Sequence, residues 1–313
     1  MYRTTNWPAY NRALINRGNI AIWFDPTTQW YAPSKGKHVR NQTYSDAAIQ
    51  CCLMIKSLFR LSLRMVTGFV ESFIHLCRLD WAAPNISDIR IPPFVEDKSI
   101  LILQSATKKS SDGLHLLVDS TGMRFLGEGE WKRKKHGPEY RRQCRKLHIG
   151  IDAKTLQIRA IQLTTNNFSD SQVLGDLLNQ FPQDEQIDSV YTDGAYDTKQ
   201  CRQVIADRQA HAVIAPRKNA KPWKDTKSST LERNELLRTI NLAKQCFSGR
   251  TLWKKWSGYH RRSMIENKMH CIKLLGDKLS ARSFDSQVNE IHARVAVLNR
   301  FTELGRPLTQ VTP

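Results

Sequence analysis

The sequence lacks any arrangement of cysteines that is typical of a metal site or a disulfide framework. Seven cysteines are scattered over 313 residues. They include no Cys-x-x-Cys pair, and an odd number fits no closed set of disulfides. The adjacent Cys51 and Cys52 lie in an apolar stretch and are expected to be small core residues. We therefore expect neither a disulfide-stapled fold nor a zinc site, and we expect the reducing cytoplasm as the compartment.

Long apolar runs are also absent. Basic residues interrupt the most apolar stretches: Lys56, Arg60 and Arg64. A helix that spans a bilayer needs about 20 mainly apolar residues, so we expect no membrane span. The segment MYRTTNWPAY at the beginning of the chain lacks the charged and then apolar pattern of a signal peptide.

Acidic residues are scarce relative to basic ones. The chain has 48 Lys and Arg against 29 Asp and Glu, which gives a formal net charge of +19. A field of this size attracts polyanions, and nucleic acid is the commonest polyanionic partner of a basic protein. Charge alone leaves open a basic enzyme of another class or a ribosome-associated protein. With 40% hydrophobic residues, the chain is long enough for one large catalytic domain and a smaller helical one.

The first part of the chain, residues 1–81, is predicted to be a helical region. Two helices are expected between Tyr44 and Asp80, with a break at Leu61 and with Ser45 as an N-cap. Short helices with basic residues favour a helix-turn-helix-like unit that binds DNA ends, although bundles of other purposes have the same pattern. Residues 82–113 contain three prolines and a polar run and are predicted to be a linker.

The pattern of apolar residues changes after this linker. Residues 114–303 are predicted to form a catalytic domain with a helical insertion at about 217–257, and residues 304–313 are predicted to be a C-terminal tail. Short apolar segments predict strands at 114–120, 146–153, 158–165, 189–196 and 211–216. Helices are predicted at 169–180, 198–208, 231–246, 259–276 and 285–303. This order predicts an α/β domain in which helices pack on a mixed sheet.

Two aspartates are predicted to close strands of this sheet, Asp119 in VDSTG and Asp193 in YTDGAYD. One such aspartate ordinarily starts a turn or caps a helix. Two of them in one sheet, each followed within a few residues by glycine, favour a shared site. Hard divalent cations prefer carboxylate oxygens, and two metal ions held in this way promote in-line phosphoryl transfer. Glu266 is the candidate third ligand.

The segment around Glu266 predicts a helix with a polar stripe. At about 100° per residue, four side chains fall within an arc of about 60°: Tyr259, Arg262, Glu266 and Lys273. Apolar residues are expected on the broadly opposite side: Met264, Ile265, Cys271, Ile272 and Leu275. A solvated polar face would show the same pattern.

The spacing Tyr-x2-Arg-x3-Glu-x6-Lys resembles the YREK signature of DDE transposases from bacterial insertion sequences. The segments VDSTG, RKLHIGID, LTTNNFSD and YTDGAYD are similar to that family's catalytic blocks and follow the same order. The resemblance covers roughly residues 114–300 and, more loosely, the helical region before them. It implies an RNase H-like catalytic domain that uses Mg²⁺ or Mn²⁺.

The resemblance also implies roles for particular residues. Three match the acidic triad that holds the metal ions: Asp119, Asp193 and Glu266. Three match signature residues that contact DNA near the scissile phosphate: Tyr259, Arg262 and Lys273. The implied substrates are double-stranded DNA with terminal inverted repeats and target DNA, which are cut and joined. The implied assembly is a homodimer in the DNA complex, in the bacterial cytoplasm and associated with the nucleoid.

The segment 131–146 is rich in Arg and Lys. In a hairpin beside Asp119 it would track the DNA backbone, although a solvated loop would have the same composition. The candidate contacts are Lys132, Arg133, Lys134, Lys135, Arg141 and Arg142. His148 is interpreted as a structural strand histidine in preference to a residue near the metals. Turn or cap roles are expected for four further acids: Asp152, Asp170, Asp188 and Asp197.

Two segments, 86–110 with its paired prolines and 239–250, are atypical of this family. Two alternatives stay open for the function. The first is an RNase H-like nuclease that does not transfer strands. The second is a catalytically inactive copy that binds DNA as a repressor.

Overall fold

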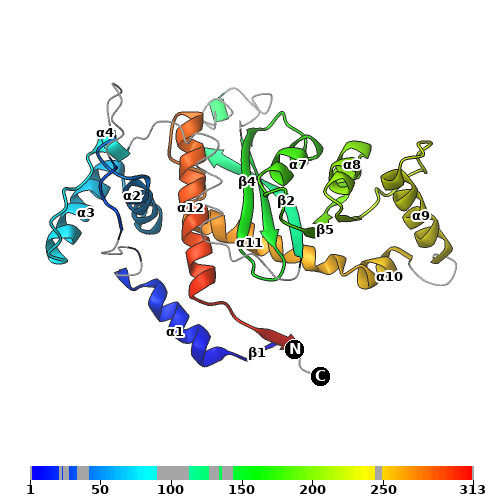
Figure 1. Cartoon of the computed structure of the whole chain (residues 1–313), viewed down its shortest axis with the longest axis horizontal. Helices are drawn as coiled ribbons and strands as arrows, with labels where there is room; N and C mark the ends of the chain where they lie inside the picture. Colours follow the sequence, from blue (N-terminus) through cyan, green and yellow to red (C-terminus); the bar gives the residue numbers. More distant parts are fainter. Residues whose placement is uncertain are drawn as a thin grey trace. The chain divides into compact units, whose positions relative to one another are not determined.

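The computed structural model is shown in Figure 1. It describes residues 2–20, 23, 28–33, 42–89, 113–126, 134–135, 144–243 and 249–311. The chain divides into two compact units. The first unit consists of Met1–Ile102 and Ile272–Pro313, and the second unit of Leu103–Cys271. In the described part of the chain, no helix combines the length and the apolar character that crossing a bilayer requires.

The first unit is mainly helical. Its elements are β1 (Tyr2–Thr4), α1 (Trp7–Arg17), α2 (Asp46–Phe59), α3 (Leu63–Leu76), α4 (Ile86–Ile89), β7 (Lys278–Leu279), α12 (Phe284–Leu304) and β8 (Thr309–Val311). Strands β1 and β8 pair in antiparallel fashion. The two helices predicted between Tyr44 and Asp80 are confirmed as α2 and α3, and the Ser45 hydroxyl accepts the hydrogen bond from the backbone N–H of Ala48 at 3.1 Å. Buried side chains of α2, α3 and α12 share one apolar cluster, in which Cys51 and Cys52 are buried as expected.

The second unit contains the sheet. Its elements are β2 (Leu114–Phe125), β3 (Arg145–Asp152), β4 (Ile158–Thr165), α7 (Asp170–Asn179), β5 (Ile187–Thr192), the 3₁₀ turn η2 (Gly194–Tyr196), α8 (Lys199–Asp207), β6 (His211–Ile214), α9 (Ser228–Ala243), α10 (Gly249–Trp256), the 3₁₀ turn η3 (Tyr259–Arg262) and α11 (Ser263–Leu275). The boundary between the two units falls within α11, between Cys271 and Ile272. The strand order is β4-β3-β2-β5-β6. β3 is antiparallel to β2 and β4, whereas β2, β5 and β6 run parallel to one another. The predicted α/β class with a mixed sheet and flanking helices is confirmed, and the arrangement is consistent with an RNase H-like domain.

Helices α7 and α8 cover one face of this sheet (Figure 1). Leu174, Leu177 and Leu178 of α7 are fully buried against apolar side chains of β2, β5 and α8. Fully burying a leucine contributes about 1.5–3 kcal/mol, so this face supplies much of the stability of the sheet that carries the aspartates. A capping box formed by Ser169 and Gln172 precedes α7, which begins at Asp170, one residue after the predicted bound of 169.

Strand β2 is longer than the sequence predicted, so Asp119 lies inside the strand and the prediction of a strand end at this residue is wrong. Residues after Asp119 continue to pair with β3, from Ser120 opposite His148 to Met123 opposite Arg145. Pairing with β3 thus carries the strand through Ser120, Thr121 and Gly122, because tertiary pairing overrides the weak local preference of these residues for a turn.

The segment 259–276, predicted as one helix, is two elements. Gly258 adopts a left-handed conformation with φ of 65°, and a 3₁₀ turn, η3, precedes α11. The predicted 100° spacing therefore does not apply between Tyr259 and Arg262. The buried face of α11 consists of Ile265, Met269 and Ile272, while the residues at 264, 271 and 275 are only half-buried.

Candidate active site

The pairing of β2 with β5 brings Asp119 and Asp193 to the same place. The two strands are parallel, and Leu117 lies opposite Tyr191. Two residues further along each strand are Asp119 and Asp193, and side chains two residues apart point to the same face of a sheet. β5 ends at Thr192, directly before Asp193. Two aspartates that are 74 positions apart in the sequence thus become neighbours where the strands separate.

Each aspartate is also held by a backbone N–H group. Asp119 Oδ1 accepts a hydrogen bond from the N–H of Ser120 at 2.8 Å. Asp193 caps the turn η2, and its Oδ1 accepts from the N–H of Ala195 at 2.9 Å. These bonds restrict the rotation of both carboxylates, because each one ties an oxygen to a neighbouring peptide group.

The guanidinium group of Arg262 lies among all three predicted acids. Its Nη2 is 2.6 Å from Oδ2 of Asp119 and 3.8 Å from Oδ2 of Asp193. Its Nη1 is 3.5 Å from Oε1 of Glu266, which follows one helical turn later on α11. The side chains of Arg262 and Asp119 are 17% and 13% exposed, whereas that of Glu266 is 62% exposed. Acids from β2, from the end of β5 and from α11 therefore converge on one cationic group.

The surroundings of Asp119 make its charged form costly. Burial raises the pKa of Asp119, and the carboxylates of Asp193 and Asp170 act in the same direction. The guanidinium of Arg262 and the N–H of Ser120 lower the pKa, but the net direction is upward. Asp119 is thus a carboxyl group whose ionisation depends on a nearby cation.

Tyr259 is half-buried at the edge of the same site. Burial raises the pKa of Tyr259. The charge of Arg262 and its hydrogen bond act in the opposite direction, and the carboxylates of Asp193 and Asp119 add to the upward shift. The ring centroid of Tyr259 is 5.4 Å from that of Trp253, and the ammonium nitrogen of Lys254 also lies 5.4 Å from the Tyr259 ring. The third signature residue, Lys273, lies in the last turn of α11.

Comparison with known protein families identifies the chain. A family model described as a transposase DDE domain matches residues 110–300. That range exceeds half of the chain and includes the three converging acids. The chain belongs to the DDE transposase family. A second model with the same description matches residues 15–128, which extends the likeness into the N-terminal region.

Membership assigns the chain to enzymes of DNA transposition, which bind DNA and generally use divalent metals. The donor chemistry of this transposase fits such ions, because Asp119, Asp193 and Glu266 offer only carboxylate oxygens. In the described ranges, no three His, Cys, Asp or Glu side chains are grouped closely enough to hold a metal ion as they stand. The guanidinium of Arg262 lies between the carboxylates instead.

Polar side chains of β3, α7 and η2 lie close to the acids of the transposase. His148 is fully buried in β3, its Nε2 lies 3.1 Å from Oγ1 of Thr164, and burial lowers its pKa to about 4. It is therefore neutral at pH 7, in keeping with its interpretation as a structural histidine. Asp170 lies 2.9 Å from the ammonium group of Lys146. The buried hydroxyl of Tyr196 has no hydrogen-bond partner in the described structure, and sequence reasoning missed this residue.

Asp197 has a role beyond the turn or cap position expected for it. It ends η2, as a cap does, but its side chain is completely buried between two guanidinium groups. Arg202 of α8 donates at 3.0 Å and Arg233 of α9 donates at 2.9 Å. The carboxylate therefore links α9 to α8 and to the turn η2, which Asp193 caps. Asp152, in contrast, is a turn residue as expected and accepts from the N–H of Lys154.

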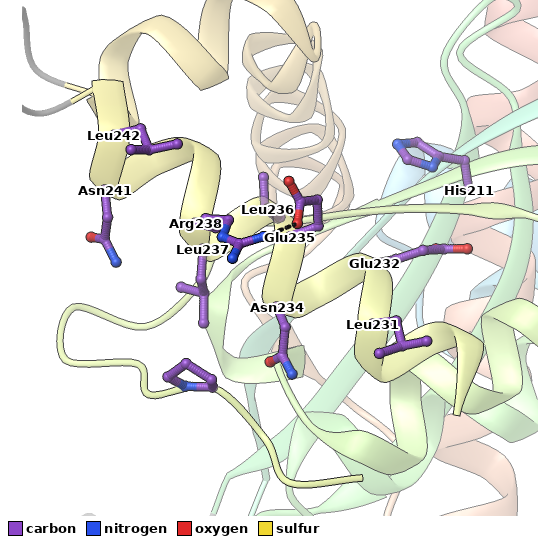
Figure 2. A pocket seen from close by; sticks show the side chains of 11 residues that line it. His211, Leu231, Glu232, Asn234, Glu235, Leu236, Leu237, Arg238, Asn241 and Leu242 are labelled. Atoms are coloured by element: carbon purple, nitrogen blue, oxygen red, sulfur yellow. Dashed lines mark ion pairs between the residues drawn. The ribbon is translucent and has the colours of Figure 1, made fainter. Parts of the chain in front are cut away.

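The second unit also contains a cavity of about 1100 Å³, most of whose lining comes from α9 (Figure 2). Leucines at 231, 236 and 242 line it together with polar groups, among them the ion pair of Glu235 and Arg238. None of the three converging acids lines this cavity. It is thus separate from the site formed by β2, β5 and α11.

Only part of the predicted basic hairpin is described. Lys134 and Lys135 are exposed residues of a short helical segment. Lys132, Arg133, Arg141 and Arg142 lie outside the described residues. The same holds for most of the predicted linker at 82–113.

Proposed function

We propose that this transposase cleaves DNA at the ends of an insertion sequence and transfers the freed strand into target DNA. The observation that supports the proposal is the convergence of Asp119, Asp193 and Glu266 on one cationic group. These carboxylates are the proposed ligands of two divalent ions, Mg²⁺ or Mn²⁺. When bound, such ions polarise the attacked phosphate and make the attacking oxygen a stronger nucleophile.

The chemistry requires two displacements at phosphorus. Water attacks the phosphate at the end of the element, the bond from phosphorus to the 3′ oxygen breaks, and a 3′-hydroxyl is released. That hydroxyl then attacks a phosphate of the target strand, forms a new phosphodiester and displaces the target's own 3′ oxygen. No covalent link between protein and DNA is needed. The carboxylates stand on a strand, a capped turn and a helix, which are rigid supports of the kind that positional catalysis demands.

Basic and aromatic residues near the acids are the proposed DNA contacts. Arg262 and Lys273 neutralise phosphates near the scissile bond, and Tyr259 stacks or donates a hydrogen bond. We assign further contacts with the DNA backbone to the basic hairpin, which includes the exposed Lys134 and Lys135. The net charge of +19 is in keeping with this extended polyanion contact.

The proposed organisation follows the same logic. Residues 1–81 bind the ends of the element, residues 82–113 link them to the catalytic domain, and residues 114–303 carry the chemistry, with an insertion at 217–257. Two ends must be cut and joined together, so a homodimer in the DNA complex is the proposed assembly. Association with the nucleoid of a bacterial cell is the proposed location.

The proposal is tested with labelled DNA from the inverted repeats that flank the gene, incubated with the protein and Mg²⁺. We expect both cleaved and joined products from the native protein. Asp119→Asn and Glu266→Gln should each lower cleavage by more than about a hundredfold, because loss of an outer-shell partner of a metal alone costs about 10–100-fold.

The matched control is Asp207→Asn, which removes the same charge from an exposed position on α8 and should cleave normally. Full cleavage by Asp119→Asn or Glu266→Gln would refute the site. Cleavage without joining would identify a nuclease, and DNA binding without either product would identify an inactive repressor copy.

A further inference from the structure

The contacts of Arg262 differ from those of the other buried arginines in the second unit. Arg202 and Arg233 are fully enclosed and donate to Asp197 at 2.9–3.0 Å, as arginines do in a structural ion pair. Arg262 makes one short bond, to Asp119, and approaches Asp193 and Glu266 only at 3.8 and 3.5 Å. It also shares a side-chain hydrogen bond with Tyr259. Its buried Nε has no hydrogen-bond partner among the described residues. The geometry of Arg262 is therefore loosely satisfied, although the group lies at the centre of the acids.

The position of this guanidinium conflicts with binding of a divalent ion. Mg²⁺ binds carboxylate oxygens at about 2.0–2.1 Å and demands near-octahedral geometry. In the described structure, Oδ2 of Asp119 faces Arg262 at 2.6 Å, so an ion at that oxygen would lie beside the positive charge of the guanidinium. Repulsion between these charges is strong at such distances where solvent is partly excluded.

The same guanidinium is well suited to a phosphate. Arginine binds phosphate with two parallel N–H donors, and such charge-assisted bonds are among the stronger ones in proteins. Arg262 stands where η3 meets α11, and its long side chain can change rotamer while the backbone stays in place. A DNA phosphate would thus offer the guanidinium a better partner than the two distant carboxylates do.

We propose that Arg262 is an internal counter-ion that keeps the three carboxylates closed to divalent metal until DNA arrives. A phosphate of the bound DNA binds the guanidinium and draws it away from the acids, and the freed carboxylates then bind the metal. This inference rests on the proposed function, since it concerns the regulation of the same site. It makes metal binding and DNA binding mutually reinforcing, because each favours the state in which Arg262 has left the acids.

The experiment measures binding of Mn²⁺ alone to the full chain without DNA, by the loss of the electron paramagnetic resonance signal of free Mn²⁺. Arg262→Ala should bind Mn²⁺ at least about tenfold more tightly than the native protein, because a unit positive charge beside the site is removed. Arg262→Lys, which keeps the charge but not the forked geometry, should fall between the two. The matched control is Arg261→Ala, an exposed neighbour with the same change in net charge, and its affinity should change less than about twofold.

Addition of end DNA gives a second readout. It should tighten Mn²⁺ binding by the native protein and change that of Arg262→Ala little. Unchanged or weaker Mn²⁺ binding by both Arg262 variants, with binding abolished in Asp119→Asn, would overturn the counter-ion role and leave the proposed function standing. Native-like Mn²⁺ binding by Asp119→Asn and Glu266→Gln would instead show that these carboxylates are not metal ligands, which would refute the proposed function.

Discussion

Asp197 offers the sharpest test of what holds the second unit together. Its carboxylate is completely buried, and the side chains of Arg202 and Arg233 that bond to it are each only 3% exposed. Arg202 also donates to the carbonyl of Ile214, and the guanidinium carbon of Arg233 lies 3.8 Å from the ring centroid of Trp223. The carboxylate is the shared acceptor for both cations, so its removal leaves two buried charges facing each other.

The expected cost of Asp197→Ala follows from this arrangement. Breaking a buried pair by removing one partner costs about 3–5 kcal/mol, since the remaining charge is uncompensated. Asp197→Asn keeps one acceptor oxygen and should cost less. The matched control is Asp207→Ala, because Asp207 is exposed and bonds only to the amide of Gln203 in the described structure. Its loss should change stability by less than about 0.5 kcal/mol.

The stabilising effect of Asp197 should also depend on pH. Burial acts to raise its pKa, but the bonds and charges of Arg233 and Arg202 outweigh burial, and the pKa is lowered. A lowered carboxyl pKa means that this stabilisation is complete above the unfolded pKa of about 3.9 and is lost as pH falls through the lower folded value. The destabilisation by Asp197→Ala should therefore stay constant from pH 7 to about pH 5 and shrink only in stronger acid.

Urea denaturation followed by tryptophan fluorescence measures the free energy of unfolding, and hydrogen exchange locates the effect. Amide protection should fall in α8 and α9 and should change little in α2 and α3, which belong to the first unit. A loss of stability below about 1 kcal/mol in Asp197→Ala, or a loss of protection spread evenly over both units, would refute this reasoning.

Two further changes test other parts of the molecule. Burial lowers the pKa of His292 to about 4 from 6.5. The unfolded state therefore binds more protons in this range, and the free energy of unfolding should fall by roughly 3 kcal/mol as pH drops from 6.5 to 4. His292→Asn should flatten that part of a urea stability profile, and an equal slope in the variant, or a similar flattening by the exposed control His75→Asn, would contradict the assignment. Gly258→Ala places a side chain at φ of 65° and should cost about 1–2 kcal/mol of stability. It should also lower cleavage, because the turn positions Tyr259 and Arg262. The control Gly68→Ala, in the open middle of α3, should stabilise the protein by about 0.5–1 kcal/mol, and normal stability and cleavage in Gly258→Ala would count against the role of the turn.

Much of the local structure follows from the sequence alone. The periodic apolar pattern predicted α2, α3 and α7, with Ser45 as the N-cap of α2, and the bounds predicted for the strand at 158–165 agree with β4. These features depend on neighbours within a few residues, which is the range over which caps and side-chain periodicity act. The family also follows from the sequence, because its motifs are short blocks whose order is visible without a fold.

The contacts within the site depend on the tertiary structure. Asp119 lies within β2 because its strand continues along β3, and it neighbours Asp193 because β2 and β5 pair in one particular register. The bond from Arg262 to Asp119 joins residues that are 143 positions apart. No local pattern encodes such a contact, because a register is set by how whole faces are buried.

The sequence by itself therefore determined which residue types were present for metal and phosphate chemistry, and which segments would become strands and helices. Only the tertiary structure decided that a guanidinium would stand among the three acids and that Asp197 would join α8 to α9. Both outcomes follow from ion pairs in partly or fully buried surroundings. The strength of such pairs depends on how much water the fold excludes, and composition and spacing do not specify that quantity.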